Sequence, residues 1–196
     1  MRKKILTALL AFSLLAANLS PAFLFPNNTF VAEASKKASK KATKKKAPSI
    51  KKIYNTIVKT FGDNYLADMP LTKEDIKARY GLSQSWYTDI IAEVPMMSAH
   101  VDTLVIAKAK NKNTKKKIKN KLTAYRQGLI NDTMQYPMNL LKIQASKVYV
   151  KGDYVFFIML GYVDSNTEET STEEQVIEAY KAENQKAVDA INALFK

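Results

Sequence analysis

The sequence predicts an α+β fold in which helices pack on a four-stranded, mainly antiparallel sheet, with the elements in the order ααββαββα. Two observations lead to this prediction. Residues 113–135 have the apolar period of an amphipathic helix. This helix is followed by two segments rich in β-branched and aromatic residues, 147–151 and 154–162. Gly152-Asp153 between them is typical of a two-residue hairpin loop.

The N-terminal half of the folded part is predicted as two helices and then two strands. Ser49 is a suitable N-cap for a first helix that ends at Gly62. Thr72 and Asp75 form the capping box of a second helix, which ends at Gly81. The two predicted strands that follow are residues 86–94, where apolar and polar residues alternate, and residues 103–109.

The C-terminal segment is predicted as a last helix. Ser171 and Glu174 have the spacing of a capping box, and an apolar stripe continues from Val176 to Leu194. Because the strands come in two pairs, we expect the helices to be segregated to one side of the sheet.

Residues 1–34 resemble a secretory signal peptide. A basic start, Met1 to Lys4, precedes an apolar run, and Ala32-Glu33-Ala34 offers a small-residue cleavage pattern. The alternative is an uncleaved N-terminal anchor, although polar residues and Pro21 interrupt the apolar run before it reaches the length of a membrane span. The chain has no cysteine, which excludes a disulfide scaffold, a thiolate nucleophile and a sulfur-liganded metal.

Residues 35–48 are predicted to be a disordered lysine-rich arm, and residues 49–196 a single α+β domain. Residues 35–52 hold nine lysines and no acidic residue. In an exported chain such an arm meets anionic cell-wall polymers and the membrane surface first, so no nucleic acid is expected as a partner. A solvated spacer is the alternative reading of the same lysines.

The candidates for chemistry are Ser98, His100 and Asp102, which bring a hydroxyl, an imidazole and a carboxylate within five residues. They suggest a hydrolase that uses His100 and Asp102, with Ser98 or a metal-bound water as nucleophile. Their spacing argues against this, because the members of a triad meet through the fold and not through proximity in sequence. One histidine and one aspartate also leave a metal site two ligands short, so neither a metal nor a cofactor is predicted.

Lys115, Lys116 and Lys117 are candidates for anion binding. They lie near the start of the long helix, where the helix dipole favours anions and disfavours cations. The alternative is a solvated basic rim, whose small energetic penalty is screened by salt.

The predicted hairpin is apolar on both faces. A two-residue loop pairs Val150 with Val155 and Tyr149 with Phe156. Either helices cover both faces, or one face is left as a partner surface. The candidates for that surface are Tyr149, Phe156 and Ile158.

Three segments resemble the bacterial domain-of-unknown-function family 4358. They are residues 132–137 (DTMQYP), residues 150–157 (VKGDYVFF), and the segment that begins with Val94-Pro95-Met96 and includes His100 and Asp102. The resemblance covers residues 53–195 and implies an exported envelope protein, often lipid-anchored in relatives. It supplies no activity, ligand or catalytic residue, and the lack of cysteine departs from the lipid-anchored members. We therefore expect a non-catalytic binding or interaction module of the cell envelope, whose protein partner is unknown.

Overall fold

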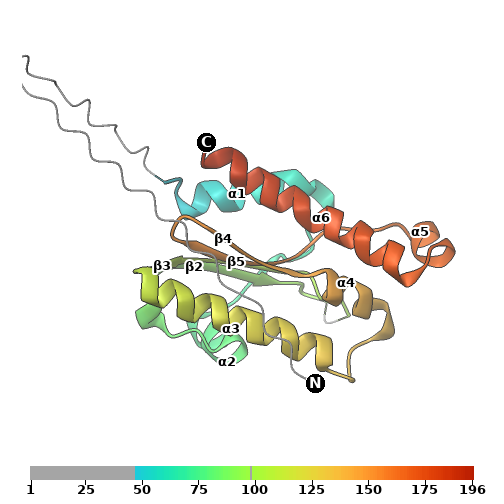
Figure 1. The fold of residues 1–196 in the computed structure, drawn as a ribbon, viewed down its shortest axis with the longest axis horizontal. Helices are drawn as coiled ribbons and strands as arrows, with labels where there is room; N and C mark the ends of the chain where they lie inside the picture. Colours follow the sequence, from blue (N-terminus) through green and yellow to red (C-terminus); the bar gives the residue numbers. More distant parts are fainter. Residues whose placement is uncertain (1–46, 98) are drawn as a thin grey trace, which may run out of the picture. The chain divides into compact units, whose positions relative to one another are not determined.

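Five strands form one antiparallel sheet in the order β1-β2-β3-β5-β4 (Figure 1). The computed structural model describes residues 47–97 and 99–196, which fall in one compact unit. The predicted signal peptide and most of the lysine arm lie outside these residues. The strands are β1 Met69–Pro70, β2 Tyr87–Val94, β3 Thr103–Ala109, β4 Lys147–Lys151 and β5 Tyr154–Met159.

The prediction of an α+β fold with an antiparallel sheet is confirmed, but the predicted number of strands is wrong. The fifth strand is β1, whose two residues pair with Val94 and Glu93 of β2. A strand of two residues cannot show the alternation by which longer strands are recognised in sequence.

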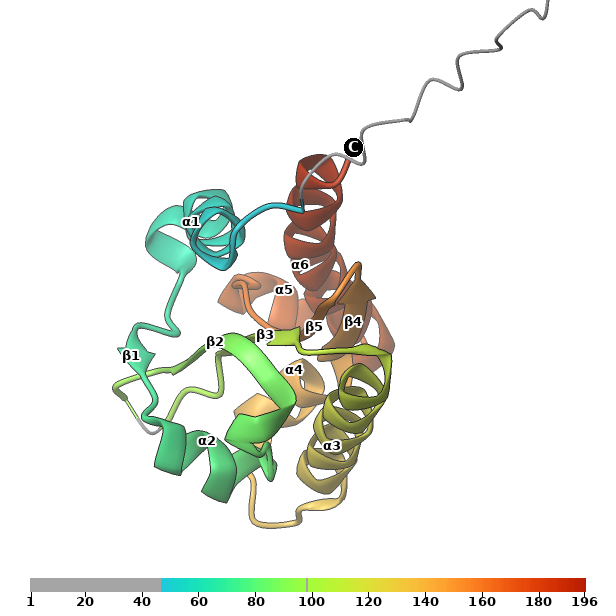
Figure 2. The same cartoon turned by 90° about the vertical axis from the view of Figure 1, so that its left-hand side faces the viewer.

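Helices cover both faces of the sheet, so the expectation that they lie on one side is wrong. In Figures 1 and 2, α1 (Ile50–Phe61) and α6 (Glu173–Leu194) lie over one face, and α2 (Lys73–Tyr80) and α3 (Lys112–Asn131) lie over the other. The reason is that the central strands are apolar on both faces. Alternate residues of β3 and β5 contribute to two separate clusters, one with α1 and α6 and one with α2 and α3.

All six residues of β5 are buried, and they form the centre of the core. The hairpin register is the predicted one, with Tyr149 opposite Phe156 and Val150 opposite Val155. Burying a side chain as large as Phe156 or Phe157 contributes roughly 1.5–3 kcal/mol relative to leaving it exposed. The hairpin therefore anchors both layers of helices.

Most of the predicted helix ends are confirmed by side-chain caps. Ser49 caps α1, and Thr72 and Asp75 form a capping box on α2, which ends at Gly81 in the left-handed conformation. The predicted cap of α6 is wrong by one residue. A short helix that the sequence did not predict, α5 (Ser165–Thr170), occupies the chain up to Ser171, so Thr172 is the N-cap of α6 and pairs with Gln175.

The connection between α3 and β4 also contains a helix that was not predicted, α4 (Leu140–Ala145), which follows a 3-10 turn at Pro137–Asn139. It lies against α6 at one end of the sheet (Figure 1). Within residues 47–97 and 99–196, none of the helices combines the length and the apolar character that crossing a membrane requires.

Candidate functional site

The three lysines predicted to bind an anion point in different directions from α3. Lys115 Nζ donates to the carbonyl of Gly152 at 2.7 Å and lies 3.6 Å from Asp153 Oδ1, so it holds the hairpin turn. Lys117 Nζ lies 5.5 Å from the centre of the ring of Trp86, which belongs to the 3-10 turn before β2. Lys116 is exposed. The structure therefore does not bring them together as one anion site.

The start of α3 is stabilised without any acidic residue in its first turn. Asn111 and Thr114 form a reciprocal capping box, in which each side chain binds the backbone N–H of the other at 3.0 Å. This cap offsets the unfavourable placement of lysines near a helix N-terminus. It also occupies the N–H of Thr114, which leaves fewer backbone donors for an external anion.

One side of α3 follows the edge of the sheet. Lys115 contacts the hairpin turn at one end of β4, and Arg126 reaches the other end. There its Nε donates to the carbonyl of Ser146 at 2.7 Å, and its terminal nitrogen donates to the carbonyl of Gln144 at 2.6 Å. Lys119 is one turn beyond Lys115, so helical spacing places it on the same side, between the two.

β4 is the outermost strand of the sheet on this side, and it adds further cations. Lys147 Nζ donates to Gln185 Oε1 of α6 at 2.9 Å. Lys151 follows Lys147 at the strand period, so it lies on the same face. Lys181 of α6 pairs with Glu178 at 2.7 Å and is half exposed.

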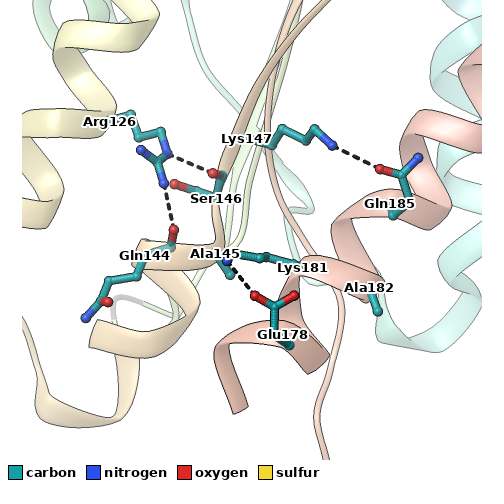
Figure 3. Close-up of a pocket in the computed structure, with 9 residues that line it drawn as sticks. All are labelled: Arg126, Gln144, Ala145, Ser146, Lys147, Glu178, Lys181, Ala182 and Gln185. Atoms are coloured by element: carbon teal, nitrogen blue, oxygen red, sulfur yellow. Dashed lines mark hydrogen bonds and ion pairs between the residues drawn. The ribbon is translucent and has the colours of Figure 1, made fainter. Parts of the chain in front are cut away.

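A cavity of about 470 Å³ opens where β4 begins, between α3, the end of α4 and the middle of α6 (Figure 3). Arg126, Lys147 and Lys181 line it, and Glu178 is its one acidic lining residue. Figure 3 shows that each cation has its own partner around this space: Arg126 points to the backbone of Ser146 and Gln144, Lys147 to Gln185, and Lys181 to Glu178. We call the cations along this side of the molecule the edge strip: Lys115, Lys119, Arg126, Lys147, Lys151 and Lys181.

The lysine arm joins the domain at the hairpin end of the edge strip. Tyr154, the first residue of β5, donates its hydroxyl to the carbonyl of Pro48 at 2.7 Å. Gly152 in the same turn accepts from Lys115. The lysine-rich sequence is covalently joined to Pro48. It is therefore attached to the domain beside one end of the strip.

Of the proposed hydrolase residues, the structure describes His100 and Asp102, and these two are not hydrogen-bonded to each other. Ser98 lies outside the described residues. His100 is exposed, while Asp102 is fully buried and its carboxylate pairs with a residue that the sequence analysis missed, Lys142 of α4. Among the described residues, no hydrogen bond joins His100 to Asp102.

Asp102 and Lys142 form a buried ion pair, with Lys142 Nζ 2.7 Å from Asp102 Oδ2. Lys142 Nζ also donates to the carbonyl of Gly161 at 2.8 Å and lies 5.6 Å from the centre of the Tyr180 ring. Burial raises the pKa of Asp102, and the adjacent Lys142 opposes that rise. The second carboxylate oxygen of Asp102 is buried and has no hydrogen-bond partner among the described residues.

A buried amide extends this polar network. Asn184 of α6 accepts from the N–H of Leu160 at 3.0 Å and donates to the carbonyls of Ala145 and Tyr180, both at 3.1 Å. Leu160 directly follows β5, and its N–H binds Asn184 instead of a neighbouring strand. β5 therefore ends at Met159, although the apolar run predicted a strand up to residue 162.

The hairpin residues proposed as a partner surface are covered. Phe156 and Ile158 are fully buried in the cluster formed with α1 and α6, and Tyr149 is half-buried against the same cluster. The hydroxyl of Tyr149 donates to Asn192 Oδ1 of α6 at 2.7 Å. Of the two alternatives, the structure shows coverage by helices on both faces.

Comparison with known proteins identifies a family but no better-characterised relative. No curated protein and no solved structure matches the chain. The model of one family, described as a domain of unknown function (DUF4358), matches residues 60–160, which is just over half of the chain. The matched part runs from the end of α1 to the end of β5 and includes α3, β4, Asp102 and Lys142. The resemblance noted in the sequence is thus confirmed, and the chain belongs to the DUF4358 family of domains of unknown function.

Proposed function

We propose that this protein is an exported, non-catalytic binding module that holds linear anionic polymers of the cell envelope along the edge strip. The observation that carries the proposal is that six cations flank one marginal strand, β4, three from α3 on one face and three from β4 and α6 on the other, with the lysine arm joined at one end and a cavity at the other.

The charges of the edge strip favour an anion along its whole length. Two of its lysines are paired with acidic residues, Lys115 with Asp153 and Lys181 with Glu178. Lys119 and Lys151 have no ion-pair partner among the described residues. The five residues of β4 span about 17 Å, enough for several charged groups of an extended polymer.

The lysine arm strengthens this interaction through its tether. Residues 35–48 hold seven lysines and no acidic residue. Once a polymer is bound at the strip, the tethered arm meets the same polymer at high effective concentration. Individual exposed cation–anion contacts are weak and are screened by salt, so useful retention depends on many of them acting together.

The strip fits a polymer better than a membrane surface. Its cations flank both faces of the marginal strand β4, and three of them line a cavity, whereas a headgroup surface is best matched by a broad basic face. The experiment must therefore distinguish binding to a polymer from binding to a membrane surface.

The test compares two triple variants with the same change in charge. In the strip variant, Lys119, Lys151 and Lys181 are replaced by Gln. In the control variant, Gln replaces Lys59 of α1 and Lys73 and Lys77 of α2, two helices that lie away from β4. On immobilised polyphosphate, the strip variant should elute at lower salt than the parent, and the control variant should elute close to the parent.

Equal shifts of the two variants would show that only net charge matters, and the strip would be rejected as a site. Binding to anionic lipid vesicles that exceeds binding to polyphosphate and falls with the strip variant would reassign the strip to the membrane surface. Deleting residues 35–46 should weaken retention further in both backgrounds, because it removes the tethered contacts.

The exported location rests on the signal-like residues 1–34 and has its own test. N-terminal sequencing of the protein recovered from the envelope should give Ser35 as the first residue. Recovery of Met1 on a membrane-bound product would support the uncleaved anchor.

A further inference from the structure

The two buried acidic residues of the domain are compensated in different ways. Asp102 has Lys142 as a partner at 2.7 Å. Glu93 on β2 is only 8% exposed, its carboxylate accepts from the hydroxyl of Tyr65 at 2.7 Å, and the hydroxyl of Tyr54 also interacts with it. No cation lies within ion-pair distance of Glu93 among the described residues. Buried carboxylates are normally paired with a cation. Glu93 is an exception, because it has no counter-ion among the described residues.

A cavity of about 410 Å³ lies beside the Glu93 side chain. α1 contributes Lys51, Tyr54 and Asn55 to its lining, and the segment after β1 contributes Leu71. It sits near the β1 margin of the sheet, over which α1 lies in Figure 2. This cavity is at the opposite edge of the sheet from the edge strip.

The open edge of β2 provides further polar groups at this cavity. β1 pairs only with Glu93 and Val94, and the N–H of Leu71 then takes the carbonyl of Ala92 at 2.9 Å. Beyond this point no described strand covers β2, and Ile90 and Ile91 line the cavity. The site therefore combines a carboxylate, an exposed backbone edge and an aromatic ring.

Tyr65, one of the two tyrosines that interact with Glu93, acts toward it only as a donor. Burial raises the pKa of Tyr65 far above its usual range, and the hydrogen bond to Glu93 raises it further. Its phenol therefore stays protonated and supplies one neutral hydrogen bond. A neutral donor satisfies one acceptor position of the carboxylate but leaves its charge without a counter-charge.

We propose that the cavity between α1 and the β1–β2 edge is a binding site for a small molecule with a primary ammonium group, which pairs with Glu93. An ammonium group has three donors, so it can bind the Glu93 carboxylate and still donate to the backbone edge of β2. The ring of Tyr54 lines the same space and suits contact with a cation or with the apolar side of the ligand. None of these contacts uses the residues of the edge strip.

Lys51 at the cavity lining limits which amines fit. Its positive charge opposes a second cation on the ligand, so a ligand with one amine and otherwise neutral or anionic groups is favoured over a polyamine. Lys51 is exposed and forms no ion pair with Glu93. If Lys51 were instead the missing counter-ion in solution, its removal would strengthen amine binding strongly.

Glucosamine and N-acetylglucosamine are the probes, because they share a ring and differ in charge at one nitrogen. Each is titrated into the full folded protein while backbone amide chemical shifts are recorded. Glucosamine should cause saturable shifts at Glu93 and its neighbours on β2 and α1, and N-acetylglucosamine should not. Equal effects of both sugars, or no saturable shift with glucosamine, would overturn the proposal.

Two variants separate the carboxylate from the general shape of the cavity. Glu93→Gln should weaken glucosamine binding by at least about tenfold, since it removes a charge-assisted hydrogen bond. Tyr65→Phe keeps the carboxylate and removes the neutral donor that lies 2.7 Å from it, so it should bind glucosamine as well as or better than the parent. Unchanged binding by Glu93→Gln, or loss of binding by Tyr65→Phe in a protein with native thermal unfolding, would overturn the assignment to Glu93.

Lys51→Gln is the matched control at the same cavity. It should leave glucosamine affinity within about threefold of the parent, since Lys51 acts at a distance through solvent. A gain as large as the loss in Glu93→Gln would identify Lys51 as the natural counter-ion and overturn the proposal of an external amine.

Discussion

Lys142 Nζ lies 2.7 Å from Asp102 Oδ2, and the two side chains, 40 residues apart in the sequence, are both buried. The pair joins α4 to the start of β3. Because Lys142 also donates to Gly161 after β5, one ammonium group ties together three segments at the same end of the sheet. Such a pair is costly to break, since removing one partner leaves the other charge buried without compensation.

Lys142→Met should therefore destabilise the domain by about 3–5 kcal/mol, measured by urea unfolding. Replacing Asp102 by Leu in the same protein should recover much of that loss, because no buried charge then remains. The control is Lys181→Met, which breaks an ion pair at the surface and should cost no more than about 1 kcal/mol. If Lys142→Met also costs no more than about 1 kcal/mol, the Asp102–Lys142 pair is solvated in solution.

The cap of α2 should make part of the domain's folding stability depend on pH. The Thr72 hydroxyl donates to Asp75 Oδ2 at 2.6 Å and the Thr72 N–H donates at 3.2 Å, and these bonds lower the pKa of Asp75. A carboxyl group whose pKa is lower in the folded than in the unfolded state stabilises the fold above its unfolded pKa. That contribution is lost as the pH falls through its folded pKa.

We therefore expect Asp75→Asn to lower the thermal midpoint at pH 7, and the difference from the parent to shrink below about pH 4. Asp63→Asn is the control, since Asp63 is exposed and makes no hydrogen bond among the described residues. A difference that stays constant from neutral to acidic pH would show that the Asp75 charge does not contribute to the cap.

The boundary between the arm and the domain should lie just before Pro48. A protein that begins at residue 47 keeps the carbonyl of Pro48 as the acceptor for Tyr154, whereas one that begins at Ser49 loses it. Deletion up to residue 46 should leave the thermal midpoint unchanged. Deletion up to Pro48 should cost about 1 kcal/mol, or about 2–4 °C.

Tyr154→Phe isolates that hydrogen bond. It should destabilise the protein that begins at residue 47 and have a smaller effect in the one that begins at Ser49, because the acceptor is already gone. Equal effects in both backgrounds would show that water replaces Pro48 without loss.

Several elements were predictable because the interactions that define them are local. The caps of α1 and α2 join residues three positions apart, and the hairpin register follows from the Gly152-Asp153 turn. The elements that were missed lack such signals. β1 is only two residues long, and α4 is six residues long and depends on its packing against α6.

The sequence by itself determined the fold class, the caps of α1 and α2, the hairpin register and the family of this protein, because each depends on neighbouring residues or on a pattern of residue types. Only the tertiary structure decided that Lys142 neutralises Asp102, that Glu93 is left without a cation, and that Arg126 and Lys147 line one cavity. These relationships join residues that are far apart in the chain. They depend on the order of the strands and on which face each helix covers, which the apolar pattern of a strand buried on both faces leaves undetermined.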